Sequence, residues 1–307
     1  MTASAPDMGT LNGLVPGQSP EPLLLPDPTT LFSHRAKRLR QLAQGHAMGA
    51  WLSFIADIAD AQNDLAVALV ENPPQRQWRR DLEALSGRLR DKLPLAALPA
   101  VESLLGQDEG RLVALADRLM SFAPTAEDLP AAPIAMAALQ LAWTRHAAAI
   151  DPTAFAVSAT AARCPVCGAP PVAGVIHVGM ASGRLRYLHC GLCQTAWHHI
   201  RAACVACGDG KDVSYRLIEG RDDGVRAETC DACKSYLKLL LVEKAPDLDP
   251  LADDLASVGL DILVGEEGYR RFGANPFLLQ SDSSVLTQTH EPHQFPHANP
   301  PHKGEGV

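Results

Sequence analysis

All eight cysteines of this 307-residue chain lie in Cys-x-x-Cys pairs, and the four pairs fall within residues 164–233. The first quartet is Cys164, Cys167, Cys190 and Cys193, and the second quartet is Cys204, Cys207, Cys230 and Cys233. Adding 40 to each residue number of the first quartet gives the second quartet. The spacing predicts a tandem repeat of one unit, CxxC-x22-CxxC, in which four thiolates surround one metal ion.

Metal binding explains this spacing better than disulfides. Two residues between cysteines place both sulfurs on one tetrahedral ion, and Gly168 and Gly208 permit the tight turn after each first pair. Disulfides need an oxidising compartment. Residues 1–28 lack the basic and apolar regions of a signal peptide, and the apolar stretch from Ala131 to Trp143 is too short to span a bilayer. We therefore expect a cytoplasmic chain without membrane insertion, carrying two closed sites of four cysteines each.

Short strands are predicted between the two pairs of each quartet. They are residues 172–178 and 184–189 in the first unit, and 213–218 and 225–229 in the second. Each pair of cysteines then lies at the end of a β-hairpin, as in zinc ribbons and rubredoxins. Such a module has almost no hydrophobic core, so metal binding should supply much of its folding free energy.

Four histidines and one tryptophan in this segment are not expected to bind the metal. Four thiolates already complete each site, so the histidines are expected at the surface or around the ligands. Trp197 follows the first quartet and is expected to shield it from solvent. The four histidines are His177, His189, His198 and His199.

Helical periodicity dominates the chain before the cysteines. Apolar stripes predict helices starting near Leu31, Trp51, Trp78 and Leu112, and residues 133–146 are apolar nearly all round, as in a central buried helix. The first helix carries a basic run, which we interpret as a solvated face rather than a nucleic-acid patch. That run is His34, Arg35, Lys37, Arg38 and Arg40. After the last cysteine, residues 234–244 and 251–263 are predicted to be helical.

The predicted fold class is α+β. An N-terminal all-α helical bundle is followed by two tandem rubredoxin-like or zinc-ribbon β-modules and by C-terminal helices. The predicted parts are a flexible proline-rich arm (1–28), the helical domain (29–155), the first ribbon (160–203), the second ribbon (204–245), a C-terminal helical segment (246–280) and a disordered His/Pro-rich tail (281–307).

Charge and composition argue against a nucleic-acid partner. The net charge is −8, and residues 163–243 carry ten Lys or Arg against eight Asp or Glu before metal and thiolates are counted. Only 5% of residues are aromatic, which is few for stacking on bases. A zinc-ribbon nucleic-acid-binding protein remains the alternative. A thiol–disulfide enzyme is the third hypothesis, although metal-bound thiolates are poor redox nucleophiles and the CxxCxGxG spacing of cysteine-rich co-chaperones is absent.

Over roughly residues 30–280 the chain resembles the formate dehydrogenase accessory protein FdhE family. The resemblance is carried by CPVCG (164–168), LHCGLC (188–193), CVACG (204–208) and CDAC (230–233), together with LFSHRAKRLRQLA and GYRRFGANPFLLQ in the flanking regions. The proline-rich start and the tail lie outside it.

The resemblance implies a non-enzymatic, chaperone-like factor for the maturation of respiratory formate dehydrogenase. Its partner would be the catalytic subunit of that enzyme, met in the cytoplasm before export, and self-association remains compatible with the sequence. The eight cysteines would be the ligands of two metal ions. Four thiolates suit iron and zinc alike, and the rubredoxin-like character of the family favours iron.

Overall fold

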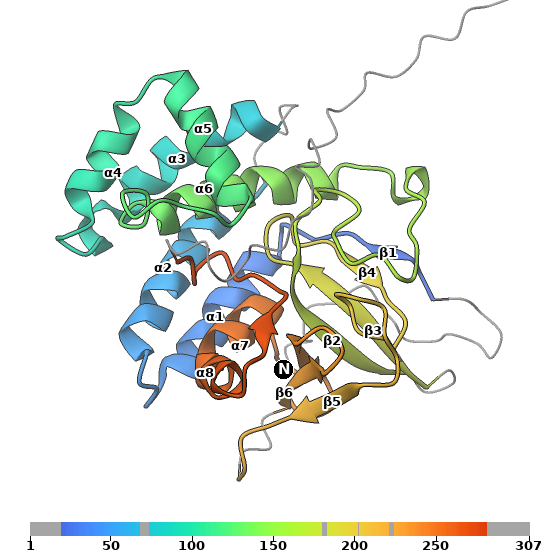
Figure 1. The fold of residues 1–307 in the computed structure, drawn as a ribbon. Coiled ribbons are helices and arrows are strands. Elements are labelled where there is room, and N and C mark those ends of the chain that lie inside the picture. Colours follow the sequence, from blue (N-terminus) through green and yellow to red (C-terminus); the bar gives the residue numbers. More distant parts are fainter. Residues whose placement is uncertain (1–19, 68–73, 180–182, 202, 221–223, 281–307) are drawn as a thin grey trace, which may run out of the picture.

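The computed structural model describes residues 20–67, 74–179, 183–201, 203–220 and 224–280, and Figure 1 shows their arrangement. The predicted tail (281–307) and residues 1–19 of the predicted arm lie outside the described residues. A helical part and a sheet lie against each other, which confirms the predicted α+β class.

Six α-helices precede the first cysteine in the described part of the chain. They are α1 (Leu31–Ala43), α2 (Gly49–Leu65), α3 (Pro74–Leu89), α4 (Leu98–Leu105), α5 (Glu109–Met120) and α6 (Ala132–Ala148), with short 3-10 turns at Arg90–Lys92 and Pro152–Ala154. Helix α6 is buried on nearly every side, as its composition predicted, and it packs against α3, α2 and α5. Helix α4 was not predicted, because it spans only eight residues.

The strands form a single sheet that contains both cysteine units. They are β1 (Leu23–Leu24), β2 (Pro171–Gly179), β3 (Gly183–Cys190), β4 (Ala196–His198), β5 (Val213–Arg216), β6 (Val225–Cys230), β7 (Ser235–Leu241) and β8 (Arg270–Arg271). The order is β1-β4-β3-β2-β7-β6-β5, with β8 added beside β7. Strands β2 and β7 run parallel and pair Gly174 with Leu239, so the two units are joined edge to edge.

The repeat predicted from the cysteines is visible in the strands. Each unit contributes a hairpin and a third antiparallel strand, β2–β3–β4 in the first and β5–β6–β7 in the second. The prediction of a helix over residues 234–244 is wrong, because Ser235–Leu241 is strand β7. An apolar run buried on both faces has no alternation that separates a strand from a helix, and β7 is buried at all five inner positions.

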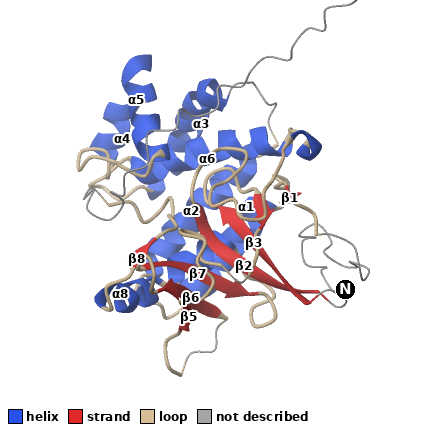
Figure 2. Cartoon of the chain, turned by 45° about the vertical axis from the view of Figure 1, so that its right-hand side comes forward, coloured by secondary structure: helices blue, strands red, loops and turns tan. Residues whose placement is uncertain are grey.

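The C-terminal segment covers one face of the sheet (Figure 2). The helical stretch predicted over residues 251–263 is present as two helices, α7 (Pro250–Ala256) and α8 (Val258–Glu266); α7 contacts β2 and β7, and α8 contacts β6 and β8. Tyr236 packs in a cluster with Leu260 and Val264 of α8. The cysteine units thus share hydrophobic cores with helices, and the expectation of modules with almost no core is wrong.

The basic face of α1 is buried at Arg35 and partly buried at Arg38. Arg35 donates from Nε to both carboxylate oxygens of Asp249 (3.0 and 3.1 Å), and these two side chains are each 1% exposed. Arg38 pairs with Asp253 on α7. Both acidic partners lie more than 200 residues after α1 in the sequence, and Asp249 follows Arg35 by 214 residues. Local charge patterning could not reveal these contacts.

We expect Arg35→Met to destabilise the protein by about 3–5 kcal/mol, because it leaves the buried carboxylate of Asp249 without its cation. Burial alone would raise the pKa of Asp249, but Arg35 holds that pKa below its ordinary value. The double variant Arg35→Met/Asp249→Asn should recover much of the loss, since asparagine is neutral and can still cap α7. Urea unfolding of the three proteins measures this. Equal stability of the single and double variants would contradict the ion-pair account.

Candidate metal centres

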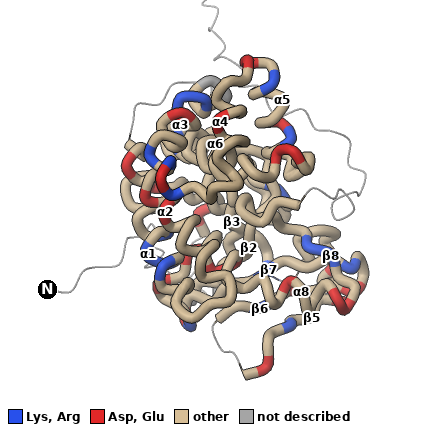
Figure 3. The backbone as a smooth tube through the Cα atoms, turned by 90° about the vertical axis from the view of Figure 1, so that its left-hand side faces the viewer, with Lys and Arg blue, Asp and Glu red and all other residues tan. Residues whose placement is uncertain are grey.

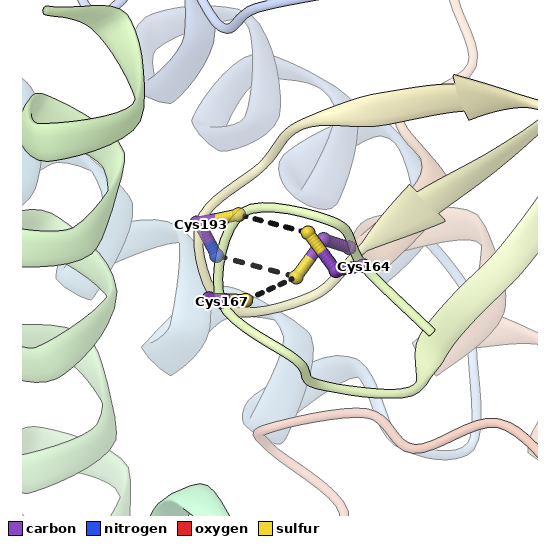
Figure 4. A group of neighbouring side chains, drawn as sticks. Cys164, Cys167 and Cys193 are labelled. Atoms are coloured by element: carbon purple, nitrogen blue, oxygen red, sulfur yellow. Dashed lines mark hydrogen bonds between the residues drawn. The ribbon is translucent and has the colours of Figure 1, made fainter. Parts of the chain in front are cut away.

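The first quartet brings together two loops from the ends of β2 and β3. Cys164 and Cys167 precede β2, whereas Cys190 ends β3 and Cys193 follows it. The Sγ atoms of Cys164 and Cys193 are 3.4 Å apart, as are those of Cys167 and Cys190. Figure 4 shows the side chains of Cys164, Cys167 and Cys193 pointing toward one another.

The second quartet repeats this arrangement around β5 and β6. The Sγ atoms of Cys204 and Cys233 are 3.8 Å apart, and those of Cys207 and Cys230 are 3.7 Å apart. The predicted glycine turns are present, because Gly168 has φ +74° and Gly208 has φ +79°. Each of these glycines donates its N–H to the carbonyl of the first cysteine in its pair, at 2.9 Å.

The donor geometry fits a tetrahedral ion. Within each quartet all four sulfurs lie within 4.8 Å of one another, and none of the eight cysteines is in a disulfide. A metal–sulfur bond of about 2.3 Å implies an edge of about 3.8 Å between sulfurs of a tetrahedron. The observed separations of 3.4–3.8 Å are close to this edge and far from the S–S bond of about 2.05 Å. The two clusters could each hold one metal ion.

A hydroxyl group stands beside one sulfur in each quartet. Thr195 Oγ1 lies 3.2 Å from Cys193 Sγ, and Ser235 Oγ lies 2.9 Å from Cys233 Sγ. Each hydroxyl is two residues beyond the last cysteine of its quartet, so it can donate a hydrogen bond to a metal-bound thiolate. We did not predict these residues, although the offset of 40 relates them in the sequence just as it relates the cysteines.

The two quartets differ sharply in burial. All four cysteines of the first quartet are buried, from 0% to 3% exposed, and belong to the main core cluster with the helices. In the second quartet Cys207 is exposed and Cys233 is partly exposed. Burial raises the pKa of the Cys164 and Cys167 thiols well above their usual value. A cation between the sulfurs counters that effect, since it favours the thiolate form.

Side chains from three helices hold the loop of residues 190–194. Gln140 on α6 donates from Nε2 to the carbonyl of Gly191 at 2.7 Å, and its Oε1 accepts from Gln62 on α2 at 2.9 Å. Arg35 on α1 donates to Gln194 Oε1 at 2.7 Å. The first quartet is therefore fixed by buried polar residues far away in sequence, and the pattern of cysteines contains no signal for them.

The histidines take no part in the two groups of possible ligands found among the described residues, which contain cysteines alone. His189 lies next to Cys190, and its Nε2 is buried without a hydrogen-bond partner in the described part of the chain. Trp197 is 0% exposed, in the same core cluster as the first quartet, and it donates from Nε1 to the carbonyl of Ala161 at 2.8 Å. That position agrees with a shielding role.

The described helices α1 and α2 do not form a polyanion-binding face. Helix α1 carries only basic charges and the adjacent α2 only acidic ones, so that opposite charges lie close together in this region of Figure 3. Arg40 of α1 pairs with Asp57 and Asp60 of α2, and two other arginines of α1 pair with Asp249 and Asp253 at the start of α7. Within the described residues, none of the helices combines the length and apolar character needed to cross a bilayer.

Three domain families match consecutive parts of the chain. "FdhE, N-terminal" matches residues 20–77 and 68–160, "FdhE, central domain" matches 163–201, and "FdhE, C-terminal domain" matches 202–278. The boundary between the last two falls between the first and second quartets. Each quartet therefore lies within one family domain.

Whole-chain relatives and a solved structure agree with these matches. Protein FdhE homolog from Edwardsiella ictaluri is 38% identical over 285 residues, covering 85% of this chain and 92% of the relative. Protein FdhE from Salmonella newport is 36% identical over 287 residues, with the same coverage. The crystal structure of the FdhE protein from Pseudomonas aeruginosa aligns with a TM-score of 0.72 and 33% identity, covering 83% of this chain and 98% of that one.

Proposed function

The chain belongs to the FdhE family, and on that premise we propose that it is an accessory factor in the maturation of respiratory formate dehydrogenase. Its action would be binding rather than catalysis, and its client would be the catalytic subunit of that enzyme, met in the cytoplasm before export. The observation that carries the proposal is the pair of four-cysteine clusters within the family fold.

The eight cysteines would hold two metal ions, one in each quartet. Four thiolates on a tetrahedral ion suit iron or zinc, and we favour iron of the rubredoxin type, which would supply a one-electron couple. Around the ions the chain itself fixes the sulfurs: backbone N–H groups of Leu192 and Cys193 lie 3.3 and 3.4 Å from Cys190 Sγ, and hydroxyls flank Cys193 and Cys233. Such hydrogen bonds to sulfur tune the potential of an iron–thiolate centre.

The second unit is the better candidate for the surface that contacts the client. Cys207 is exposed, and the neighbouring strand β5 carries exposed Tyr215, followed in the chain by exposed Leu217. The first quartet is enclosed by helices and cannot be touched without opening the core. Client binding should therefore depend on the integrity of the second unit.

An oxygen-free pull-down tests this function. Metal-loaded protein should retain the catalytic subunit of formate dehydrogenase from the same organism, and Cys204→Ser/Cys207→Ser should weaken retention at least about tenfold, or 1.4 kcal/mol. Lys211→Ser replaces an exposed side chain in the same unit and is the matched control. This variant should retain the catalytic subunit as well as the unaltered chain does. Absence of retention by the metal-loaded protein would contradict the proposed client.

A further inference from the structure

A cavity of about 110 Å³ lies on the sheet and includes no residue of either quartet. Its apolar wall is made by Ile176 and Leu239, on the parallel strands β2 and β7 that join the two units. The side chain of Lys238 reaches Asp254 on α7. Because neighbouring side chains of a strand point to opposite faces, Leu239 and the cavity lie on the face away from α7.

Three arginines line this cavity, with one acidic residue among them. Arg186 donates to both carboxylate oxygens of Glu228, at 3.2 and 2.8 Å, and the two side chains are 0% and 4% exposed. Arg201 and Arg226 also line the cavity, and neither forms an ion pair within the described residues. One carboxylate therefore faces three guanidinium groups, which leaves an excess positive charge of two in a partly enclosed space.

Arg186 also has a polar group that the protein leaves unused. Its Nε is buried and has no hydrogen-bond partner in the described part of the chain. Gly174 makes room for Leu239, since a Cβ on this glycine would lie only 2.6 Å from Leu239, and it would be in ordinary contact, at 3.5 Å, with that Nε. A buried N–H without an acceptor is unfavourable, and an anion bound in the cavity would offset the positive charge around it.

We propose that this cavity binds an oxyanion, the carboxylate or phosphate group of a small ligand, between Arg201 and Arg226 and beside the buried Arg186–Glu228 pair. A guanidinium group can donate two parallel hydrogen bonds to two oxygens of a carboxylate or of a phosphate. The volume is well below the roughly 300–1,000 Å³ of pockets for drug-sized ligands. The cavity therefore suits one small anionic group with an apolar edge against Leu239. This site does not depend on the function proposed above.

Titration of the zinc-loaded protein with inorganic phosphate or acetate, at constant ionic strength in chloride, tests the site. The Nε–Hε resonances of the arginines should shift and saturate in NMR spectra, with Arg186 among those that move. Arg226→Gln should weaken binding at least about tenfold, whereas Arg270→Gln, which removes an exposed arginine from β8, should leave it unchanged. Arg226 is preferred to Arg186 for this test, because removal of Arg186 would leave Glu228 buried without a partner.

The relative affinities of the two probes also indicate which anionic group the ligand carries. Tighter binding of phosphate supports a phosphorylated ligand, and tighter binding of acetate supports a carboxylate. The proposal fails if neither probe gives a saturable shift beyond that of chloride. It also fails if Arg226→Gln binds both anions as tightly as Arg270→Gln does.

Discussion

Cys167→Ser should unfold the whole protein, whereas Cys207→Ser should unfold only the second unit. Cys167 is 1% exposed and lies in the main core cluster together with α2, α3 and α6. Serine there would remove one of four thiolates and bury a hydroxyl. The apparent free energy of binding of a structural zinc ion is about 10–16 kcal/mol in zinc-finger peptides. The free energy of unfolding of a whole domain is only about 5–15 kcal/mol. Loss of the ion from this core is therefore expected to exceed the stability of the fold.

Cys207 is exposed, so its replacement disturbs fewer packed groups. The second unit should lose its metal and its hairpin, while the helices and the first quartet stay folded. Helical circular dichroism, metal content and hydrogen exchange of the two variants measure the difference. Val166→Ala, between Cys164 and Cys167, is the matched control in the first unit, because this valine is 6% exposed but is not a ligand. Loss of all helical signal in Cys207→Ser would contradict the prediction.

Local features of the chain predicted the parts of the site that depend on local geometry. The cysteine spacing predicted two quartets, the glycine turns at Gly168 and Gly208 and the hairpins between the pairs, because each of these involves residues close together in the chain. Residues 133–146 would be apolar on nearly all sides of a helix, and this composition likewise predicted the buried helix α6. The offset of 40 predicted a repeat, and the strands show one.

Several of the features that were missed depend on contacts between distant residues. Pairing of β2 with β7 joins the units, but a strand edge carries no local signal for its partner. Arg35 is polar and lies in a basic run, so charge patterning placed it in solvent, while the fold buries it between Asp249, Gln140 and Gln194. The unequal burial of the two quartets has the same origin. The sequences around the cysteines are alike, whereas only the first quartet lies under α6.

The burial contrast leads to the second large prediction, which concerns metal removal. With both quartets loaded, a chelator in excess should remove one metal ion quickly and the other at least about a thousandfold more slowly. A chelator can approach the second centre at Cys207, which is exposed, without a change in the fold. The first centre requires the core to open, and opening that costs about 5 kcal/mol or more reduces the accessible population by over a thousandfold. Release can be followed by the absorbance of a coloured chelator complex.

Cys204→Ser/Cys207→Ser provides the control for the assignment of the two phases. This variant should lose the fast phase and keep the slow one, since its first quartet is intact. Addition of urea below the unfolding midpoint should accelerate the slow phase alone, because urea favours the opened state. Two ions released at equal rates would show that the enclosure of the first quartet does not protect its metal. A fast phase that survives in the variant would assign rapid release to the first centre and contradict the prediction directly.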